Sequence, residues 1–286
     1  MRIANYDSRL VLVDGSDGID VFEASRTRFG PSPSNAYEHW TEFRAWAHDF
    51  LTSKAFEDAE RIQLELEKLG SPSPTPPQVF AIAMNYGDHV REGGYDIPSA
   101  PGVFTKFQSS IAGPFGVIQL PDGNVDWEIE LVVVIGQSGH RIHPEDAWDH
   151  VAGLTVGQDI SERIGQHRPP APQFSLAKSY PGFSPMGPWL TTPDECENVD
   201  NIEMQTLLND EVVQQSSTGE MIFDVPSIIS HLSQAVTLFP GDVIFTGTPA
   251  GVGKGRTPPL FLSDGDVLRS SITGLGTMRH ELVARM

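Results

Sequence analysis

The sequence of 286 residues is poor in cysteine and has no long apolar run. Its single cysteine, Cys196, cannot form a disulfide within the chain, which fits a reducing cytoplasm. No stretch of about 18 apolar residues is present, so no segment is predicted to span a membrane. The first ten residues also lack the apolar centre of a signal peptide. We therefore expect a cytoplasmic protein without a membrane partner.

Basic residues are also scarce. The chain has 19 lysines and arginines against 38 aspartates and glutamates, a formal net charge of −19. Such a surface repels phosphates, so nucleic acid is not an expected partner. Hydrophobic residues make up 39% of the chain and charged residues 20%, which is typical of a globular protein with a sizeable core.

Motifs of several common enzyme classes are incomplete. The stretch 247–255, GTPAGVGKG, resembles a phosphate-binding loop, but Thr248 stands where that loop needs its first glycine. In 182–187, GFSPMG, Met186 replaces a glycine of the serine-hydrolase elbow. Cys196 lies in the acidic stretch DECENVD, which disfavours the thiolate form. The sequence therefore gives little support for nucleotide binding or for a serine or cysteine nucleophile.

Residues 1–72 are predicted to form a small α/β N-terminal domain. Short apolar stretches flank DGSDG at 14–18, as in a β-hairpin. We interpret the recurring apolar residues in 40–51 and in 62–69 as two amphipathic helices. The proline-rich stretch 71–78, SPSPTPPQ, cannot be helical and is predicted to be a connector. We place the domain boundary there.

Residues 73–286 are predicted to form a second, β-rich domain. Short apolar stretches rich in β-branched residues predict strands at 79–84, 116–120, 129–136 and 242–247. Two segments, 145–153 and 226–236, predict helices, the second with Ser227 as a candidate N-cap. The whole chain is thus expected to have a mixed, β-rich α+β fold.

Two glutamates begin the apolar stretch DWEIELVVVIG at 126–136. Residues two apart in a strand point to the same face, so Glu128 and Glu130 are expected to project together. An exposed strand face would explain them without any function. However, the run that follows predicts a strand buried on both faces, where two like charges need a cation. Asp159 follows another β-like stretch and is a third candidate ligand. Such an all-oxygen site favours Mg²⁺, Mn²⁺ or Ca²⁺ over zinc.

A histidine and a glutamate lie three residues apart in NYGDHVRE at 85–92. If this segment is helical, His89 and Glu92 can meet, and the carboxylate would orient the imidazole as a general base. An ordinary surface pair is the alternative interpretation.

Seven segments in order make the chain resemble the fumarylacetoacetate hydrolase family. They are NYGDHVRE, PGVFTKFQSSIAGP (101–114), DWEIELVVVIG, GLTVGQDISERIGQ (153–166), AKSYPGFSPMGPWL (177–190), LNDEVVQQSSTGEMIF (208–223) and PGDVIFTGTPAGVG (240–253). The likeness covers about residues 75–286. It implies a β-roll catalytic domain at 73–286, which carries the site, and a homodimer.

The resemblance also implies roles for individual residues. Glu128, Glu130 and Asp159 would hold Mg²⁺ or Mn²⁺; oxygen ligands alone do not distinguish these ions from Ca²⁺. His89 and Glu92 would form a dyad that activates water. The implied catalytic and substrate-binding residues are Arg163, Gln166 and Lys178, with Thr248 on the substrate side. Lys106 is a further candidate for the same pocket, or else an ordinary exposed lysine.

The segment around Asp159 departs from the family pattern in two places. Gln158 stands where asparagine is common, and Ile164 replaces the acidic residue that usually follows the arginine. The second change leaves the ion pair of Arg163 uncertain and does not remove a predicted ligand.

The resemblance implies a metal-dependent hydrolase that cleaves a C–C bond of a 1,3-dicarbonyl keto acid, such as an acylpyruvate or a diketo acid. His89 would deprotonate the attacking water, and Lys178 and Gln166 would stabilise the oxyanion. Two alternatives within the family use the same site: decarboxylation of oxaloacetate and isomerisation of a hydroxydienoate. A non-catalytic ligand-binding protein is the alternative from another class.

Overall fold

The computed structural model describes residues 1–284, and its main element is a sheet of twelve strands. Ten of them follow one another in the order β4 (Ile62–Gln63), β3 (Asp17–Asp20), β2 (Arg9–Asp14), β1 (Arg2–Tyr6), β14 (Ser184–Thr191), β12 (Val151–Gln158), β11 (Ile129–Ile135), β17 (Val243–Phe245), β6 (Val79–Ala83) and β7 (Gly102–Thr105). The other two, β5 (Leu69–Gly70) and β8 (Ile111–Ala112), pair with β1 and β14.

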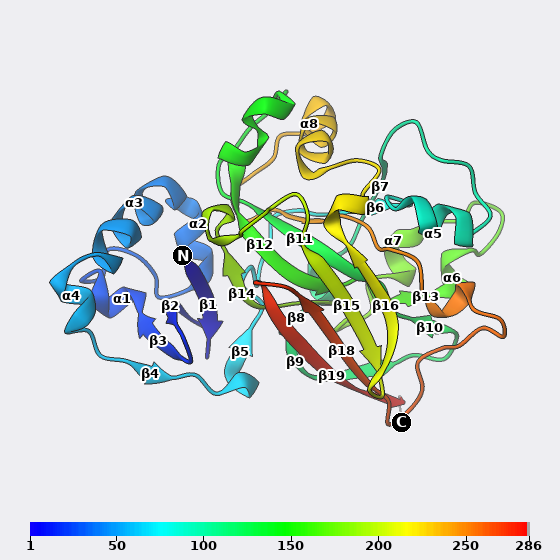
Figure 1. Ribbon diagram of the computed structural model, residues 1–286, viewed down its shortest axis with the longest axis horizontal. Coiled ribbons are helices and arrows are strands. Elements are labelled where there is room, and N and C mark those ends of the chain that lie inside the picture. The colour runs from blue at the N-terminus through cyan, green and yellow to red at the C-terminus, as the bar shows by residue number, and fades with distance from the viewer. Residues whose placement is uncertain (285–286) are drawn as a thin grey trace.

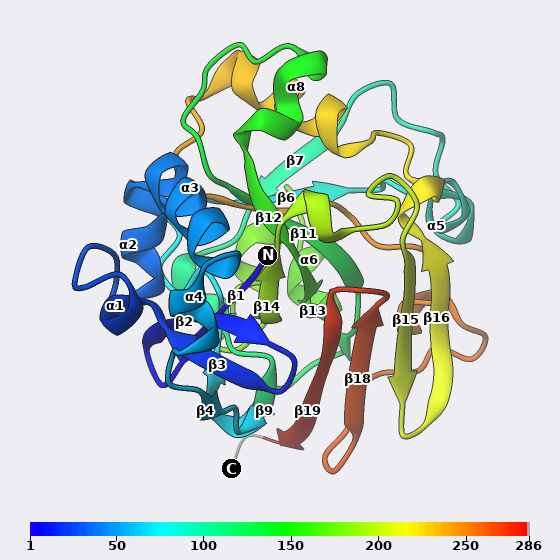
Figure 2. The ribbon, with the colours of Figure 1, turned by 60° about the vertical axis from the view of Figure 1, so that its left-hand side comes forward.

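A second sheet of five strands lies in front of the first in Figure 1 and is seen more openly in Figure 2. Its order is β16 (Glu211–Ser217), β15 (Glu203–Leu208), β18 (Val267–Ile272), β19 (Gly276–Ala284) and β9 (Phe115–Leu120). A short pair, β10 (Val125–Asp126) with β13 (Ser161–Glu162), lies near the site described below. The predicted mixed, β-rich α+β fold is confirmed.

The helices are short, and all but α8 gather in two places. The N-terminal group, on the left of Figure 1, is α1 (Val21–Ala24), α2 (Pro33–Glu38), α3 (Trp40–Leu51) and α4 (Lys54–Glu57). On the right are α5 (Gly87–Glu92), α6 (Arg163–Gln166) and α7 (Phe174–Ala177), while α8 (Val225–Ala235) lies at the top. Six single-turn or short 3-10 helices, η1 to η6, complete the described elements.

Most predicted elements are present. The hairpin β2–β3, helix α3 and the strands at β6, β9, β11 and β17 all fall where the apolar patterns place them. Helix α8 is also present, but its N-cap is Asp224, whose carboxylate accepts from the backbone N–H of Ser227 at 2.9 Å. The predicted capping residue therefore supplies the donor and not the acceptor.

One helix prediction is wrong, and a second is right only in part. The segment 62–69 forms β4, a 3-10 turn η1 (Leu66–Lys68) and the start of β5. Its residues Ile62, Leu64 and Leu66 recur every second position, which is the period of an extended chain. The helix expected at 145–153 is the 3-10 helix η3 (Pro144–His150), which ends where β12 begins.

The main sheet crosses the predicted domain boundary near residue 72. Strand β1 pairs antiparallel with β14, with Ile3 opposite Leu190, so N-terminal strands extend the sheet of the larger part. The division into 1–72 and 73–286 stays a prediction. This continuity fixes the N-terminal helices against the sheet that carries the candidate site.

Strand β11 is buried along its whole length and faces two cores. Its residues Leu131 and Val133 belong to a core that also contains residues of β12, β15 and α8. Val132 and Val134, on the opposite face, belong to a core with α3. We call six contacting rings of that second core the aromatic cluster: Phe29, Tyr37, Trp40, Phe43, Trp46 and Phe50.

Candidate active site

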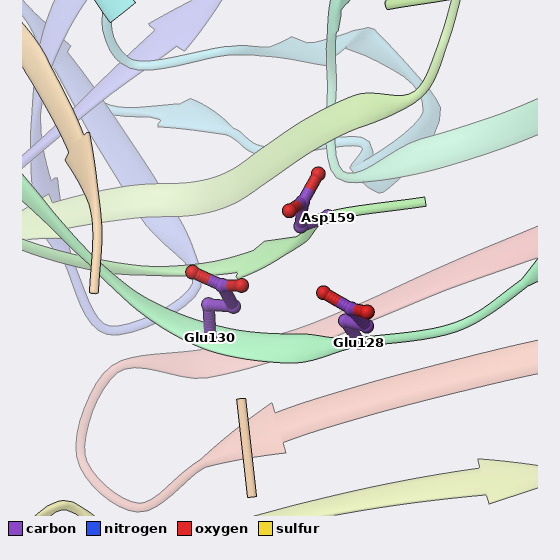
Figure 3. A group of neighbouring side chains, drawn as sticks. All are labelled: Glu128, Glu130 and Asp159. Atoms are coloured by element: carbon purple, nitrogen blue, oxygen red, sulfur yellow. The ribbon is translucent and has the colours of Figure 1, made fainter. Parts of the chain in front are cut away.

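Three carboxylates meet where β11 begins and β12 ends. The antiparallel register places Ile129 opposite Gln158, so the residues just beyond them, Glu128 and Asp159, are neighbours. The backbone N–H of Asp159 donates to Glu128 O at 2.9 Å. Figure 3 shows the side chains of Glu128, Glu130 and Asp159 pointing toward one another. One carboxylate oxygen from each lies within 4.8 Å of the others, and we call these residues the acidic triad.

The acidic triad is almost completely buried. Glu130 and Asp159 are each 1% exposed and Glu128 is 6% exposed. The backbone N–H of Gly247 donates to Glu130 Oε2 at 2.6 Å. Gly247 has φ +98°, and a Cβ there would lie 2.7 Å from Asn85 Cβ, so only glycine allows this approach. Three buried oxygen donors fit a hard divalent cation such as Mg²⁺ or Mn²⁺.

Two buried lysines lie against the triad. Lys178 Nζ donates to Glu128 Oε2 at 2.7 Å and to Asp159 Oδ2 at 2.6 Å. Lys106 Nζ donates to Asp159 Oδ1 and to the backbone oxygen of Phe183. Lys106 is 3% exposed, so the interpretation of it as an ordinary surface lysine is wrong.

Arg163 has a partner that we did not predict. Its Nε donates to Asp126 Oδ2 at 2.8 Å, and its Nη1 lies 2.6 Å from Glu128 Oε1. Nη1 also donates to Gln166 Oε1 at 3.0 Å. Ile164, which replaces the usual acidic residue, is 56% exposed. The ion pair left uncertain by that change is therefore made with Asp126.

Asp126 connects two segments of the site. Its Oδ1 accepts from Gly253 N at 2.7 Å, and its Oδ2 accepts from Lys254 N at 2.9 Å. The residue is fully buried. The alternation that singled out Glu128 and Glu130 also includes Asp126, two positions earlier, and is the signal that would have identified it.

These contacts form one buried network of charges, which we call the charged network. Its members are the carboxylates of Asp126, Glu128, Glu130 and Asp159 and the cations of Lys106, Arg163 and Lys178. Counted at their formal charges, the four carboxylates and three cations sum to one negative charge. A divalent cation would change that balance to one positive charge, which suits an anionic ligand.

The pKa values in the network are displaced in opposite directions. Burial raises the pKa of Glu130 well above its ordinary value, and the nearby charges of Asp159 and Glu128 raise it further. Burial also opposes the charge on Glu128, but Lys178 and Arg163 outweigh it and hold that pKa below the ordinary value. Burial likewise opposes the charge on Lys178, yet Asp159 and Glu128 raise its pKa. The negative charge of Glu130 is thus offset less by neighbouring cations than the negative charge of Glu128.

His89 and Glu92 meet on α5 as the sequence predicts. His89 Nδ1 lies 3.1 Å from Glu92 Oε2, and both side chains are less than one-fifth exposed. Glu92 Oε1 also accepts from the backbone N–H of Gly251 at 3.0 Å. We assign the Nδ1–H tautomer, because Nδ1 faces a carboxylate, which leaves Nε2 as a proton acceptor.

One cavity of about 420 Å³ contains the exposed parts of this arrangement. Its lining includes the predicted residues His89, Glu92, Glu128, Arg163, Gln166, Lys178 and Thr248. Thr248 Oγ1 accepts from Gln214 Nε2 at 2.9 Å. The predicted residues outside the lining, Lys106, Glu130 and Asp159, contact lining residues or other members of the triad. The structure therefore brings all ten predicted residues to one place.

Comparison with known proteins identifies the class to which such a site belongs. Residues 78–283 match the family model for the fumarylacetoacetate hydrolase C-terminal region, so the chain belongs to the fumarylacetoacetate hydrolase family. The predicted β-roll type of fold is confirmed by a solved structure from Mycobacterium smegmatis, 49% identical with a TM-score of 0.92, in which both chains are covered fully.

Two further relatives carry names that describe chemistry. The chain is 43% identical to human "Oxaloacetate tautomerase FAHD2A, mitochondrial", over 74% of this chain and 68% of the relative. It is 29% identical, with a TM-score of 0.82 and full coverage of both chains, to maleylpyruvate hydrolase from Sphingobium sp. SYK-6, solved with manganese(II) and pyruvate. The chain is therefore an enzyme of this family.

The location of the protein stays a prediction. No helix within residues 1–284 is both long and apolar enough to cross a membrane. The human relative is named as mitochondrial, so the comparison gives no support to the cytoplasmic location that the cysteine content favours.

Proposed function

We propose that the protein binds a divalent cation and interconverts the keto and enol forms of an oxaloacetate-type 2-oxo acid. One observation carries this proposal: His89, Glu92 and Glu128 line the same cavity. Glu128 belongs to the acidic triad, whose buried oxygen atoms can bind a cation. The name of the 43% identical human relative supports this choice of reaction.

The acidic triad would hold the cation, with Mg²⁺ and Mn²⁺ as the expected ions. A bound cation supplies a Lewis acid that polarises the 2-oxo acid and acidifies the neighbouring C–H. Arg163, fixed by Asp126, would bind a substrate carboxylate through its guanidinium. Lys178, held protonated by Asp159 and Glu128, would stabilise negative charge on the substrate oxygen.

Proton transfer is assigned to the dyad. His89 Nε2 would accept the proton from C3 of the keto form, while Glu92 steadies the imidazolium through Nδ1. The enolate oxygen then takes up one proton, and the product is the enol. The reverse sequence regenerates the ketone, so no atom is gained or lost.

Hydrolysis of an acylpyruvate-type C–C bond is the second candidate. Its support is the same dyad, together with the Sphingobium hydrolase. His89 would deprotonate a water whose oxygen bonds to the C4 carbonyl carbon. The C3–C4 bond then breaks, and protonation at C3 gives pyruvate and a carboxylic acid.

Two further expectations, a homodimer and the division into two domains, also remain proposals. Light scattering would measure the oligomeric state.

One set of assays separates the candidates. Metal-free protein is given Mn²⁺ and incubated with the enol of oxaloacetate, with ketonic oxaloacetate and with acetylpyruvate. We expect accelerated loss of the enol absorbance without release of CO₂, and loss of that acceleration in His89→Ala. Release of pyruvate and CO₂ would instead establish a decarboxylase, and conversion of acetylpyruvate alone a hydrolase. Cation-independent turnover would contradict the metal site, and no turnover at all would leave a ligand-binding protein.

A further inference from the structure

A buried glutamine of the five-stranded sheet is hydrogen-bonded to a residue that lines the candidate active-site cavity. Gln214, on β16, donates from Nε2 to Thr248 Oγ1 at 2.9 Å and to the backbone oxygen of Pro249 at 3.0 Å. Thr248 belongs to the cavity lining. Gln214 is 2% exposed and Thr248 is 3% exposed. The function proposed above gives Gln214 no role.

The orientation of the Gln214 amide is fixed by a group that can only donate. The backbone N–H of Ile129 lies 3.0 Å from Oε1, so the amide oxygen must occupy that position. Nε2 then faces Thr248. Because the amide nitrogen donates and does not accept, the Thr248 oxygen is the acceptor in this hydrogen bond.

A second buried glutamine, Gln158, supports the same direction. Its Oε1 accepts from the backbone N–H of Glu128 at 2.9 Å, which fixes this amide as well. Its Nε2 donates to Ser270 Oγ at 2.9 Å and to Thr206 Oγ1 at 3.3 Å. Thr206 Oγ1 in turn donates to Gln214 Oε1 at 3.2 Å. Gln158 is one of the two departures from the family pattern, and its longer side chain belongs to this connection.

These contacts form a chain of hydrogen bonds that runs in one direction. The donors follow one another from Gln158 through Thr206 and Gln214 to Thr248, and all four residues are buried. Hydrogen bonds in such a chain polarise one another, so each step strengthens the next. The last member of the chain is the one that lines the cavity.

The hydroxyl hydrogen of Thr248 is left to donate to a ligand. Its oxygen already accepts from Gln214, and within residues 1–284 its O–H has no acceptor. Lys178 and Arg163 line the same cavity. An O–H donor in a cavity with two cationic side chains suits an anionic oxygen.

We propose that Gln214 is a positioning residue that holds the Thr248 hydroxyl as a donor to an anionic oxygen of the bound 2-oxo acid. The identity of this ligand rests on the function proposed above. If the amide donor is removed, the hydroxyl can donate to a protein acceptor, and its lone pairs then face the anion.

Binding of pyruvate to Mn²⁺-loaded protein, measured by calorimetry, tests this direction separately from turnover. Thr248→Val removes the hydroxyl at nearly constant volume, and Thr248→Ser keeps it. Gln214→Glu replaces the amide donor with an acceptor, to which the hydroxyl should then donate. Gln215→Glu adds the same charge at the exposed neighbouring position and is the matched control.

We expect Thr248→Val and Gln214→Glu each to weaken pyruvate binding by about tenfold or more, as loss of one hydrogen bond to a charged group does. Thr248→Ser and Gln215→Glu should leave the affinity nearly unchanged. The two losses should not add. In the Thr248→Val background, Gln214→Glu should weaken binding only through the repulsion of its charge, which the double-mutant cycle removes.

Gln214→Met removes the amide without adding a charge, and it provides the same test if Gln214→Glu does not fold. It should weaken pyruvate binding in the presence of Thr248 and not in Thr248→Val. An undiminished affinity in Thr248→Val, equal losses in the two backgrounds, or no binding of pyruvate to the parent protein would overturn the proposal. If the expected pattern is found but the protein converts neither oxaloacetate nor acetylpyruvate, the proposed function fails and the positioning role stands.

Discussion

Two different interiors lie along one face of strand β11. Val132 and Val134 pack in the same hydrophobic core as the aromatic cluster. Glu130, two residues earlier on the same face, belongs to the charged network. The two interiors meet at Phe245, a member of the apolar core whose ring lies 5.4 Å from Lys106 Nζ.

The apolar core stabilises the fold, whereas the charged network is suited to binding a ligand. Burial of aromatic rings contributes favourable free energy. Burial of charges carries a desolvation penalty that ion pairs offset only in part. Strand β11 therefore connects a stabilising apolar core to a charged network that lowers stability. The apolar core fixes the position of the charged network.

The largest expected effect comes from Glu130→Gln, which separates stability from function. Loss of this metal-binding carboxylate should lower kcat/KM by at least about 10³-fold, because a bound cation provides several kcal/mol of transition-state stabilisation. The unfolding free energy of the metal-free protein should stay equal or rise, because the change removes like-charge repulsion with Asp159 and Glu128. Kinetics with Mn²⁺ and denaturant unfolding with a chelator measure the two quantities. Retained activity would refute the assignment.

Phe43→Ala should have the opposite profile. Phe43 is fully buried and contacts Phe29, Trp40 and Trp46. Its truncation should lower the unfolding free energy by about 3–5 kcal/mol. The folded fraction should keep its Mn²⁺ affinity and its kcat/KM, because this ring packs in the apolar core. A large loss of Mn²⁺ affinity in folded protein would show that the two interiors are not separable in this way.

Asp126→Asn tests the connection between Arg163 and the loop at Lys254. Asparagine keeps the volume but lacks the second acceptor oxygen, so Arg163 should lose its fixed orientation. We expect a fall of about 10²-fold in kcat/KM, mostly as a higher KM for carboxylate substrates. The exposed Asp122→Asn is the matched control. An unchanged KM would show that Asp126 has only a structural role.

An effect on stability alone is expected from His280, which is buried in strand β19 of the five-stranded sheet. Burial lowers its pKa to about 4, so the folded protein keeps a neutral imidazole that donates to Gly113 O. Below the unfolded pKa of about 6.5 only the unfolded chain takes up the proton. Stability should therefore fall by up to about 3 kcal/mol between pH 6.5 and 4.

The variant His280→Gln keeps a donor for Gly113 and removes the titrating group. Its unfolding free energy should depend less on pH in that window than the parent protein's. Exposed His231→Gln should leave the dependence unchanged. Identical pH profiles for His280→Gln and the parent would contradict the assignment.

The sequence predicts the rigid parts of the site well. Alternation in DWEIELVVVIG indicates a strand with two carboxylates on one face, and β11 has this arrangement. The i, i+3 spacing of His89 and Glu92 indicates a helical pair, and α5 brings them to 3.1 Å. Both predictions depend only on the local period of a strand or helix.

Contacts between distant segments could not be predicted in the same way. Lys106 and Asp159 are 53 residues apart, and Lys254 and His167 are 87 apart, so only the register of β11 with β12 and the loop paths bring them together. The segment 62–69 shows a different failure, because a period of two was interpreted as helical.

The most direct test of the proposed metal centre is the titration of metal-free protein with Mn²⁺, followed by electron paramagnetic resonance. Wild type, Glu128→Gln and His89→Ala would be compared. We predict one tight Mn²⁺ per chain in wild type and in His89→Ala, and loss of that tight binding in Glu128→Gln. Equal Mn²⁺ affinity in wild type and Glu128→Gln would contradict a cation site at the acidic triad.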